Sequence, residues 1–194
     1  MKKIVLSMAA IALVALISCK DDKKKTEDEV TITEEKIEEV VTNKAKTLQV
    51  ALVQKSGSTA SGDLEFRELD GVVTLEAKIS GLTPGMHAIH IHEKADCSAA
   101  DGTSTGGHWN PTFAPHGKWG AAEGYHRGDI GNFEADASGD GHITMQTDEW
   151  CLGCADETKN VIGKAIIVHA GVDDFTTQPT GNAGGRVSCG GIIE

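Results

Sequence analysis

Short segments in which every second residue is apolar recur along most of this chain. The clearest is 73–79 (VTLEAKI), which follows a turn-forming Asp-Gly pair. A period of two places the apolar side chains on one face of a β-strand. Glycine-rich turns such as 81–85 separate these segments. The pattern therefore predicts half-buried antiparallel strands joined by turns.

Strand signals continue through residues 46–194 and predict a single domain there. They lie at 48–52, 64–66, 73–79, 85–92, 128–133, 143–147, 165–169 and 186–189. Only 4% of the residues are aromatic and 23 are glycine, which suits short strands and long loops better than helices. The expected fold class is all-β, a sandwich or barrel of about eight strands.

Residues 1–18 have the pattern of a secretory signal peptide. Two lysines near the start precede an apolar run at 4–17, which is too short to remain as a membrane-spanning helix. The ending LISC at 16–19 resembles the lipobox of bacterial lipoproteins, which implies cleavage before Cys19 and a lipid on its sulfur. An ordinary signal peptide with an incidental cysteine is the alternative.

Residues 19–45 are expected to form a lipidated, charged and flexible tether. They are dense in Lys, Asp, Glu and Thr and have little to bury. The acidic residues after Cys19 resemble a signal for display on the cell exterior. The expected location is the cell envelope, either facing the periplasm or on the cell surface at the outer membrane, with the membrane as a partner through the lipid anchor.

The net charge of −11 at pH 7 argues against nucleic acid as a partner. Binding to phosphates requires a basic stripe, and here 18 lysines and arginines face 29 acidic residues. The charge mainly indicates solubility.

One predicted strand, 85–92 (GMHAIHIH), carries three of the eight histidines. His90 and His92 are two positions apart, so their imidazoles leave the same face while the isoleucines beside them enter a core. Two parallel imidazoles on a rigid strand form half of a metal site. A pair of surface histidines at the rim of a barrel is the alternative.

Two long segments without periodicity interrupt the strands. Residues 93–125 contain Cys97, His108 and His116, and a second segment covers 170–185. Loops of this length inside a compact domain are usually functional or disordered. The histidines in the first segment indicate a functional loop.

Six motifs follow one another in the folded part of the chain. They are HIH at 90–92, GHWNP at 107–111, HG at 116–117, HRGDIGN at 126–132, VHAG at 168–171 and GNAGGRVSCG at 181–190. In this order they resemble the copper/zinc superoxide dismutase family over about 46–194. The resemblance implies a Greek-key β-sandwich or barrel, and an enzyme that converts superoxide anion into oxygen and hydrogen peroxide.

The resemblance also implies two metal sites, with one copper and one zinc in each subunit. The copper ligands would be His90, His92, His108 and His169. The zinc ligands would be His108, His116, His126 and Asp129. His108 would therefore bridge both metals as an imidazolate. Copper accepts imidazole nitrogens and can change valence, whereas zinc suits a closed structural site.

The predicted catalytic residues are His108 and Arg186. In the implied cycle, one superoxide reduces copper and leaves as oxygen while His108 is protonated. A second superoxide takes up the electron, that proton and a further solvent proton, and leaves as hydrogen peroxide. Arg186 matches the family arginine that attracts the anion, and its permanent charge and fork of donors suit a small oxyanion. Thr180 matches a residue that narrows the entrance.

Behind the ligands, the family has a carboxylate that links a copper histidine to a zinc histidine. Asp173 lies at the matching position and would join His90 to His116, with Asp174 as the competing candidate. His87 matches a histidine that ties loops together near the site without binding a metal.

Two pairs of cysteines have different status. Cys97 and Cys189 match the family disulfide, which an exported protein permits. Cys151 and Cys154 have no counterpart in the family pattern, and one CxxC without a second pair is weak evidence for zinc. A local disulfide, which an oxidising compartment favours, and free or redox-active thiols are the alternatives for this pair.

The long loops depart from the family pattern. The segment between Asp173 and Arg186 is shorter than in cytosolic members and contains no lysine. Steering of superoxide would then fall to Arg186, helped by Lys94 or Lys118. Subunit contacts lie partly in such loops, so a homodimer is one arrangement that the resemblance allows but does not imply.

Two other functions fit parts of the pattern. A copper and zinc carrier or buffer on the same fold would bind metals without turnover, but relatives of that kind typically lack a copper ligand or the arginine. A structural adhesin would not need so many ligand residues around one loop. The complete ligand set and Arg186 favour an antioxidant enzyme.

Overall fold

The computed structural model describes residues 44–194. The predicted signal peptide, Cys19 and most of the predicted tether lie outside the described residues. Within 44–194, no helix has the length and apolar character needed to cross a membrane.

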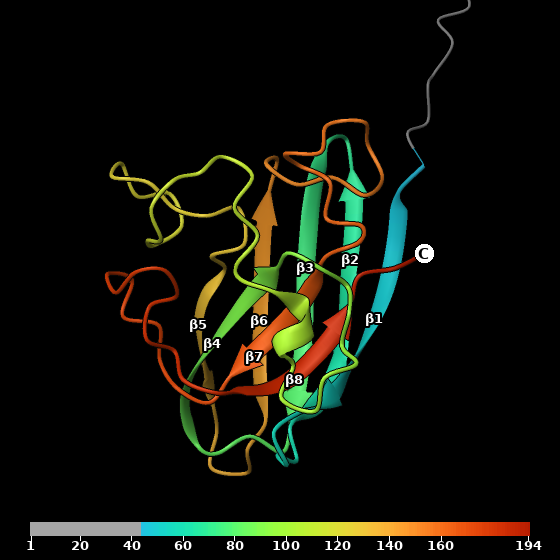
Figure 1. Ribbon diagram of the computed structural model, residues 1–194. Coiled ribbons are helices and arrows are strands. Elements are labelled where there is room, and N and C mark those ends of the chain that lie inside the picture. Colours follow the sequence, from blue (N-terminus) through green and yellow to red (C-terminus); the bar gives the residue numbers. More distant parts are fainter. Residues whose placement is uncertain (1–43) are drawn as a thin grey trace, which may run out of the picture. The chain divides into compact units, whose positions relative to one another are not determined.

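Within residues 44–194, eight antiparallel strands form one closed barrel, which confirms the all-β prediction (Figure 1). In chain order they are β1 (Lys46–Gln54), β2 (Ser61–Leu69), β3 (Val72–Ser80), β4 (Gly85–His92), β5 (Gly131–Ala135), β6 (Gly141–Thr147), β7 (Ala165–His169) and β8 (Arg186–Gly191). Around the barrel the order is β1-β2-β3-β6-β5-β4-β7-β8. The connections from β3 to β4 and from β6 to β7 therefore join strands that are not neighbours. A 3-10 turn, η1 (Thr103–Thr105), lies in the first long loop.

The alternation in the sequence becomes alternating burial in β3. Its inward-facing side chains are at most 3% exposed, and they are Val73, Leu75, Ala77 and Ile79. They pack in the barrel interior with residues such as Phe66 of β2 and Ile89 of β4. Full burial of one such apolar side chain stabilises the fold by roughly 1.5–3 kcal/mol. The barrel interior is therefore a stable support for the outward-facing side chains and the loops.

β4 and β7 differ from β3 because they are buried on both faces. They pair with each other, with His90 opposite Ile167. In Figure 1 the 93–130 loop (green to yellow) and the 170–185 loop (orange to red) both extend over the side of the barrel where β4 lies. His90 and His92 point away from the barrel interior and are nevertheless at most 1% exposed, because these loops cover them.

The main chain of Ile91 connects β4 to two parts of the first long loop. Its N–H donates to Gly128 O at 2.9 Å, and its C=O accepts from Trp109 N–H at 2.8 Å. Gly128 N–H in turn donates to Trp109 O at 3.0 Å. A Cβ on Gly128 would lie 2.2 Å from Ile91 O, so only glycine fits there. The sequence predicts a strand from residue 128, but Gly128 belongs to this link and β5 itself begins at Gly131.

The loop between β6 and β7 is less exposed than its polar sequence indicates. Trp150 is 1% exposed and Leu152 is 5% exposed, and both belong to the hydrophobic core. Leu152 O also accepts a hydrogen bond from Lys46 Nζ at 2.8 Å. In Figure 1 this orange loop lies at one end of the barrel, beside the ends of β2 and β3.

Two disulfides are present among the described residues. One joins Cys97 to Cys189 across 92 positions, and the other joins Cys151 to Cys154 across three. The CxxC pair is therefore a local disulfide in this structure.

The two disulfides close loops of very different length, which predicts that they contribute unequally to stability. Replacing Cys97 and Cys189 by serine should lower the free energy of unfolding by about 4–5 kcal/mol, because a cross-link that closes a longer loop removes more conformational entropy from the unfolded chain. The same change at Cys151 and Cys154 should cost less than about 3 kcal/mol. Urea unfolding of the metal-free proteins measures both values. An equal or reversed order would contradict the prediction.

Candidate metal centre

Seven buried side chains form two adjoining groups that share His108. The first group is His90, His92, His108 and His169, and the second is His108, His116, His126 and Asp129. Within each group the nearest ligand atoms of all members lie within 4.8 Å of one another. The structure thus brings together the residues that the sequence predicted as copper and zinc ligands.

Two paired strands supply most of the first group. His90 and His92 lie on β4, and His169 ends the neighbouring β7. A main-chain bridge between His92 and His108 brings the loop residue alongside. The ring centroids of His90 and His108 are 4.0 Å apart, and those of His92 and His169 are 5.6 Å apart. The barrel therefore orients three imidazoles, and the loop adds the fourth.

Each histidine of the first group has one buried ring nitrogen without a hydrogen-bond partner among the described residues. These atoms are His90 Nδ1, His92 Nε2, His108 Nε2 and His169 Nε2. Buried polar atoms in native proteins nearly always have a partner. Four unpaired imidazole nitrogens in one small group fit a metal ion that prefers nitrogen ligands, as copper does.

The opposite ring nitrogens of the strand histidines are held by acceptors. The pairs are His90 Nε2 and Asp173 Oδ2 at 2.9 Å, His92 Nδ1 and Gly106 O at 3.0 Å, and His169 Nδ1 and Gly184 O at 3.2 Å. A carbonyl or carboxylate requires an N–H on the nitrogen that it faces. The proton is then fixed on that side, and the other nitrogen keeps its lone pair for a ligand bond.

Asp129 lies at the centre of the second group. Its Oδ1 is 2.8 Å from His108 Nδ1 and 3.2 Å from His126 Nδ1, and its Oδ2 is 3.0 Å from His116 Nδ1. The main-chain N–H groups of Gly117 and His126 donate to Oδ2 at 3.2 and 2.8 Å. The Nδ1 atoms of His116 and His126 make no hydrogen bond within 44–194 despite these distances. Three imidazole nitrogens around one carboxylate fit a closed four-ligand zinc site.

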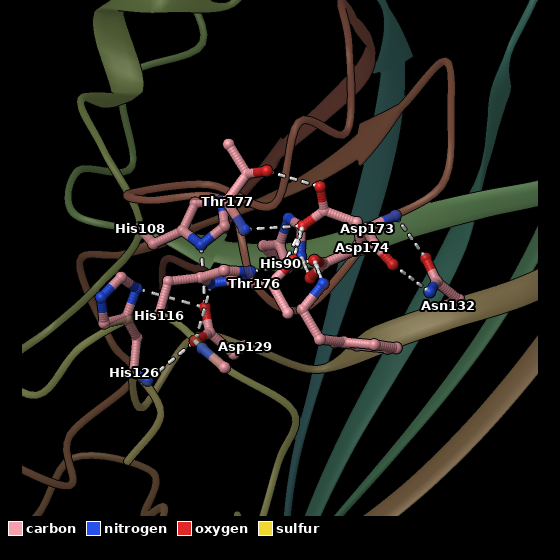
Figure 2. Close-up of polar contacts among 12 residues, drawn as sticks. His90, His108, His116, His126, Asp129, Asn132, Asp173, Asp174, Thr176 and Thr177 are labelled. Carbon is pink, nitrogen blue, oxygen red and sulfur yellow. Dashed lines mark hydrogen bonds and ion pairs between the residues drawn. The ribbon is translucent and has the colours of Figure 1, made fainter. Parts of the chain in front are cut away.

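Asp173 connects the two groups, as Figure 2 shows. Its carboxylate accepts from His90 Nε2 and from His116 Nε2, each at 2.9 Å. Its own main chain is held by the side-chain amide of Asn132 through two hydrogen bonds of 2.8 Å. Asp174, the competing candidate, accepts hydrogen bonds within its own turn instead. The carboxylate that faces both histidines is therefore that of Asp173.

Burial and neighbouring carboxylates shift the pKa values of the histidines in opposite directions. Burial lowers the pKa of three residues of the first group, to about 2 for His92, about 4 for His108 and about 3 for His169. These imidazoles are neutral and able to bind a cation. Burial also opposes the charged form of His116, but hydrogen bonds to Asp129 and Asp173 raise its pKa to about 9. The two carboxylates thus favour positive charge at the second group.

Arg186 begins β8 and is tied to the first group through carbonyl oxygens. Its Nη1 donates to Gly102 O at 2.7 Å and to Thr105 Oγ1 at 2.8 Å, and its Nη2 donates to Gly106 O at 2.8 Å. Gly106 O is also the acceptor for His92 Nδ1. One carbonyl therefore sets the position of the guanidinium relative to an imidazole of the first group.

The other residues predicted to act near the site are His87, Thr180, Lys94 and Lys118. His87 is buried, with Nδ1 2.8 Å from His169 O and Nε2 2.8 Å from a carbonyl in the turn before β4, so it joins that turn to the end of β7. Thr180 is half-buried in the 170–185 loop. Lys94 and Lys118 are exposed.

Sequence reasoning did not identify three residues that shape the site. These are Thr105, Asn132 and Gly181. Gly181 has a φ of 64°, and a Cβ there would lie 1.8 Å from Asp173 Oδ1 and 2.7 Å from His116 Nε2. A glycine in a glycine-rich loop gives no local signal of such a contact, because a neighbour such as His116 comes from a segment far away in sequence.

The sequence of this chain is similar to those of one protein family. A model of the family described as copper/zinc superoxide dismutase matches residues 60–192. A Cu-Zn superoxide dismutase of Onchocerca volvulus is 37% identical over an alignment of 152 residues, which covers 72% of this chain and 92% of that protein. An extracellular Cu-Zn superoxide dismutase of Brugia pahangi is 34% identical over an alignment of 151 residues, which covers 73% of this chain and 73% of that protein.

Solved structures are also similar to this chain. A double mutant of a SOD-like protein from Bacillus subtilis superposes with a TM-score of 0.67 at 34% identity, covering 75% of this chain and 97% of that one. The clock protein EA4 superposes with a TM-score of 0.65 at 34% identity, covering 76% of this chain and 94% of that one. These similarities extend over most of the described barrel and its loops.

A single methyl group at Gly181 should disturb both metal groups. We expect Gly181→Ala to displace the Asp173 carboxylate from His90 and His116, and to lower metal affinity by about 10- to 100-fold, as loss of such supporting contacts does. Competition with a chelator measures the affinity. Gly57→Ala is the control, because Gly57 also has a positive φ of 71° but a methyl group there would meet nothing within 4 Å. Equal affinities in the two variants would contradict the prediction.

Proposed function

Because the chain belongs to the copper/zinc superoxide dismutase family, we propose how its residues divide the work of this enzyme. The protein dismutates superoxide to oxygen and hydrogen peroxide, and it uses copper and zinc. We assign each metal, the superoxide anion and the transferred proton to individual side chains.

We assign one copper to the first group and one zinc to the second. The observation that carries this assignment is the set of four unpaired nitrogens that meet in the first group, with His108 facing it through Nε2 and facing Asp129 through Nδ1. Copper when bound supplies one-electron redox chemistry, and zinc supplies a fixed charge that holds the loop.

The chain's own residues then have distinct roles. His108 Nε2, the nitrogen that faces the first group, accepts a proton and returns it to the product once in each cycle. Arg186 attracts superoxide and orients it, because its guanidinium is permanently charged and fixed by three hydrogen bonds. Asp129 and Asp173 keep the imidazoles in their orientations.

A dismutation assay tests the function directly. Protein loaded with copper and zinc should be active, whereas metal-free protein and His169→Ala should lose activity by at least about 100-fold, since each lacks a complete copper site. His142→Ala is the control, because His142 is exposed and its ring lies near Glu76 instead. If the loaded protein binds both metals but is no more active than His169→Ala, the carrier function is favoured.

Thr105 allows a finer test of the role of Arg186. Its buried hydroxyl donates to Gly102 O and accepts from Arg186 Nη1. Thr105→Val keeps the shape but removes the hydroxyl, and a hydrogen bond to a charged group contributes about 1.5–3 kcal/mol. Arg186 keeps its hydrogen bonds to Gly102 O and Gly106 O, so we expect only part of that free energy to affect the rate. The rate should be about 3- to 10-fold lower with unchanged metal content, and it should recover in Thr105→Ser. A wild-type rate in Thr105→Val would exclude this role.

For the location, we propose a lipoprotein that is exported to the cell envelope and anchored through Cys19. Support comes from the signal pattern at 1–18 and the lipobox at 16–19. A relative that is named extracellular also supports export. An anchored enzyme would remove superoxide at the membrane surface, and it would need no special feature of the barrel to remain there.

Membrane partition tests the anchor. In cells that express the full chain, wild-type protein should sediment with membranes and Cys19→Ser should not, because one sulfur carries the diacyl group. Fractionation with immunoblotting measures the distribution. The same distribution for both proteins would show that the anchor is absent, whereas the dismutation assay would be unaffected.

A further inference from the structure

The loop between β6 and β7, residues 148–164, makes contacts that dismutation as described above does not use. It contains the Cys151–Cys154 disulfide, and its Trp150 is buried against Phe66 in the barrel core with 6.3 Å between ring centroids. This segment is therefore anchored to the barrel and does not move independently of it. Its other side faces the first long loop, close to the second group of ligands.

Glu149 is the polar contact between the two loops. Its two carboxylate oxygens each lie 2.9 Å from the hydroxyl of Tyr125, which donates to them. The same carboxylate forms an ion pair with Arg127. The next residue, Trp150, donates from Nε1 to Arg127 O at 2.9 Å. Two consecutive residues of the loop thus hold both Tyr125 and Arg127.

Aromatic packing strengthens the same contact. The ring of Trp119 lies 4.9 Å from that of Tyr125 and 5.4 Å from that of Trp150, measured between centroids. The three rings form a row from the barrel to the first long loop. Such pairs stabilise the contact beyond their buried area, and they restrict where Tyr125 can lie.

The residue between the two held residues is His126. Its N–H donates to Asp129 Oδ2 at 2.8 Å, and its Nδ1 lies 3.2 Å from Asp129 Oδ1. A movement of the main chain at Tyr125 or Arg127 would move that imidazole. Arg127 Nε is buried without a partner, and Glu149 is the carboxylate within salt-bridge distance of Arg127 among residues 44–194. Glu149 therefore supplies the negative charge that pairs with the guanidinium of Arg127.

We propose that Glu149 is a positioning residue for the zinc site. Through its contacts with Tyr125 and Arg127, Glu149 holds His126 in its ligand position. The inference rests on the proposed assignment of zinc to the second group. The barrel, through the β6–β7 loop, then fixes a ligand that would otherwise depend on the first long loop alone. Preorganisation of this kind slows release of a bound metal, because the ligand cannot swing away.

The test is the rate at which zinc leaves the holoenzyme when a chelator is added in excess. Glu149→Gln keeps the size of the side chain and removes its charge, and we expect zinc to leave about 10-fold faster. Copper should leave at the wild-type rate, because the other ring nitrogens of His90, His92 and His169 are held by acceptors that Glu149 does not contact. Glu157→Gln is the matched control, since Glu157 is an exposed carboxylate of the same loop. Both metals should leave this control at wild-type rates.

A double-mutant cycle separates positioning from general loosening. Tyr125→Phe keeps the ring on Trp119 and removes the hydroxyl, so combining it with Glu149→Gln should accelerate zinc release by less than the product of the single effects. An unchanged zinc rate in Glu149→Gln, or equal acceleration of zinc and copper, would overturn the proposal. If wild-type protein binds no zinc, the assignment of the second group fails instead, so the two failures are distinguishable.

Discussion

The carboxylate of Asp129 is the interaction on which the ordered part of the first long loop depends. It faces three imidazole nitrogens and accepts from two main-chain N–H groups, and all of these belong to residues 108–129. A loop of this length has little apolar surface of its own with which to offset the entropy of ordering. Zinc bound among the same atoms would act as a core for the loop. Because His108 belongs to both groups, the order that Asp129 creates extends to the first group as well.

The barrel and the loops divide the construction of the site. Strands β4 and β7 fix three imidazoles with the precision of a paired sheet, and the loops close over them so that polar side chains on the outside of a barrel become buried. Asp173, in the second long loop, accepts a hydrogen bond from one histidine of each group. The Cys97–Cys189 disulfide joins the first loop to β8, which also carries Arg186. Each loop is thus held at more than one point.

Much of this arrangement could be predicted from sequence, and the reasons for the rest are physical. The spacing of His90 and His92 beside two isoleucines is a local pattern, and it predicts a strand with both imidazoles on one face. The remaining ligands followed from resemblance, because no local pattern brings residues 108, 126 and 169 together. The sequence around Trp150 is polar and gives no local sign that this residue is buried, yet it is only 1% exposed. Contacts such as that of Glu149 with Tyr125 join residues 24 positions apart, and such pairs leave no periodicity in the sequence.

The link at Ile91 is made by main-chain atoms alone, and this bears on how such a protein can change during evolution. Hydrogen bonds from the N–H and C=O of Ile91 to Gly128 and Trp109 do not depend on which side chain residue 91 carries, as long as it is not proline. Only Gly128 is restricted by the link itself. The first long loop can therefore diverge in sequence and length between fixed points without losing its attachment to the strand. Lineages can vary the surface around the metals while the metals stay where they are.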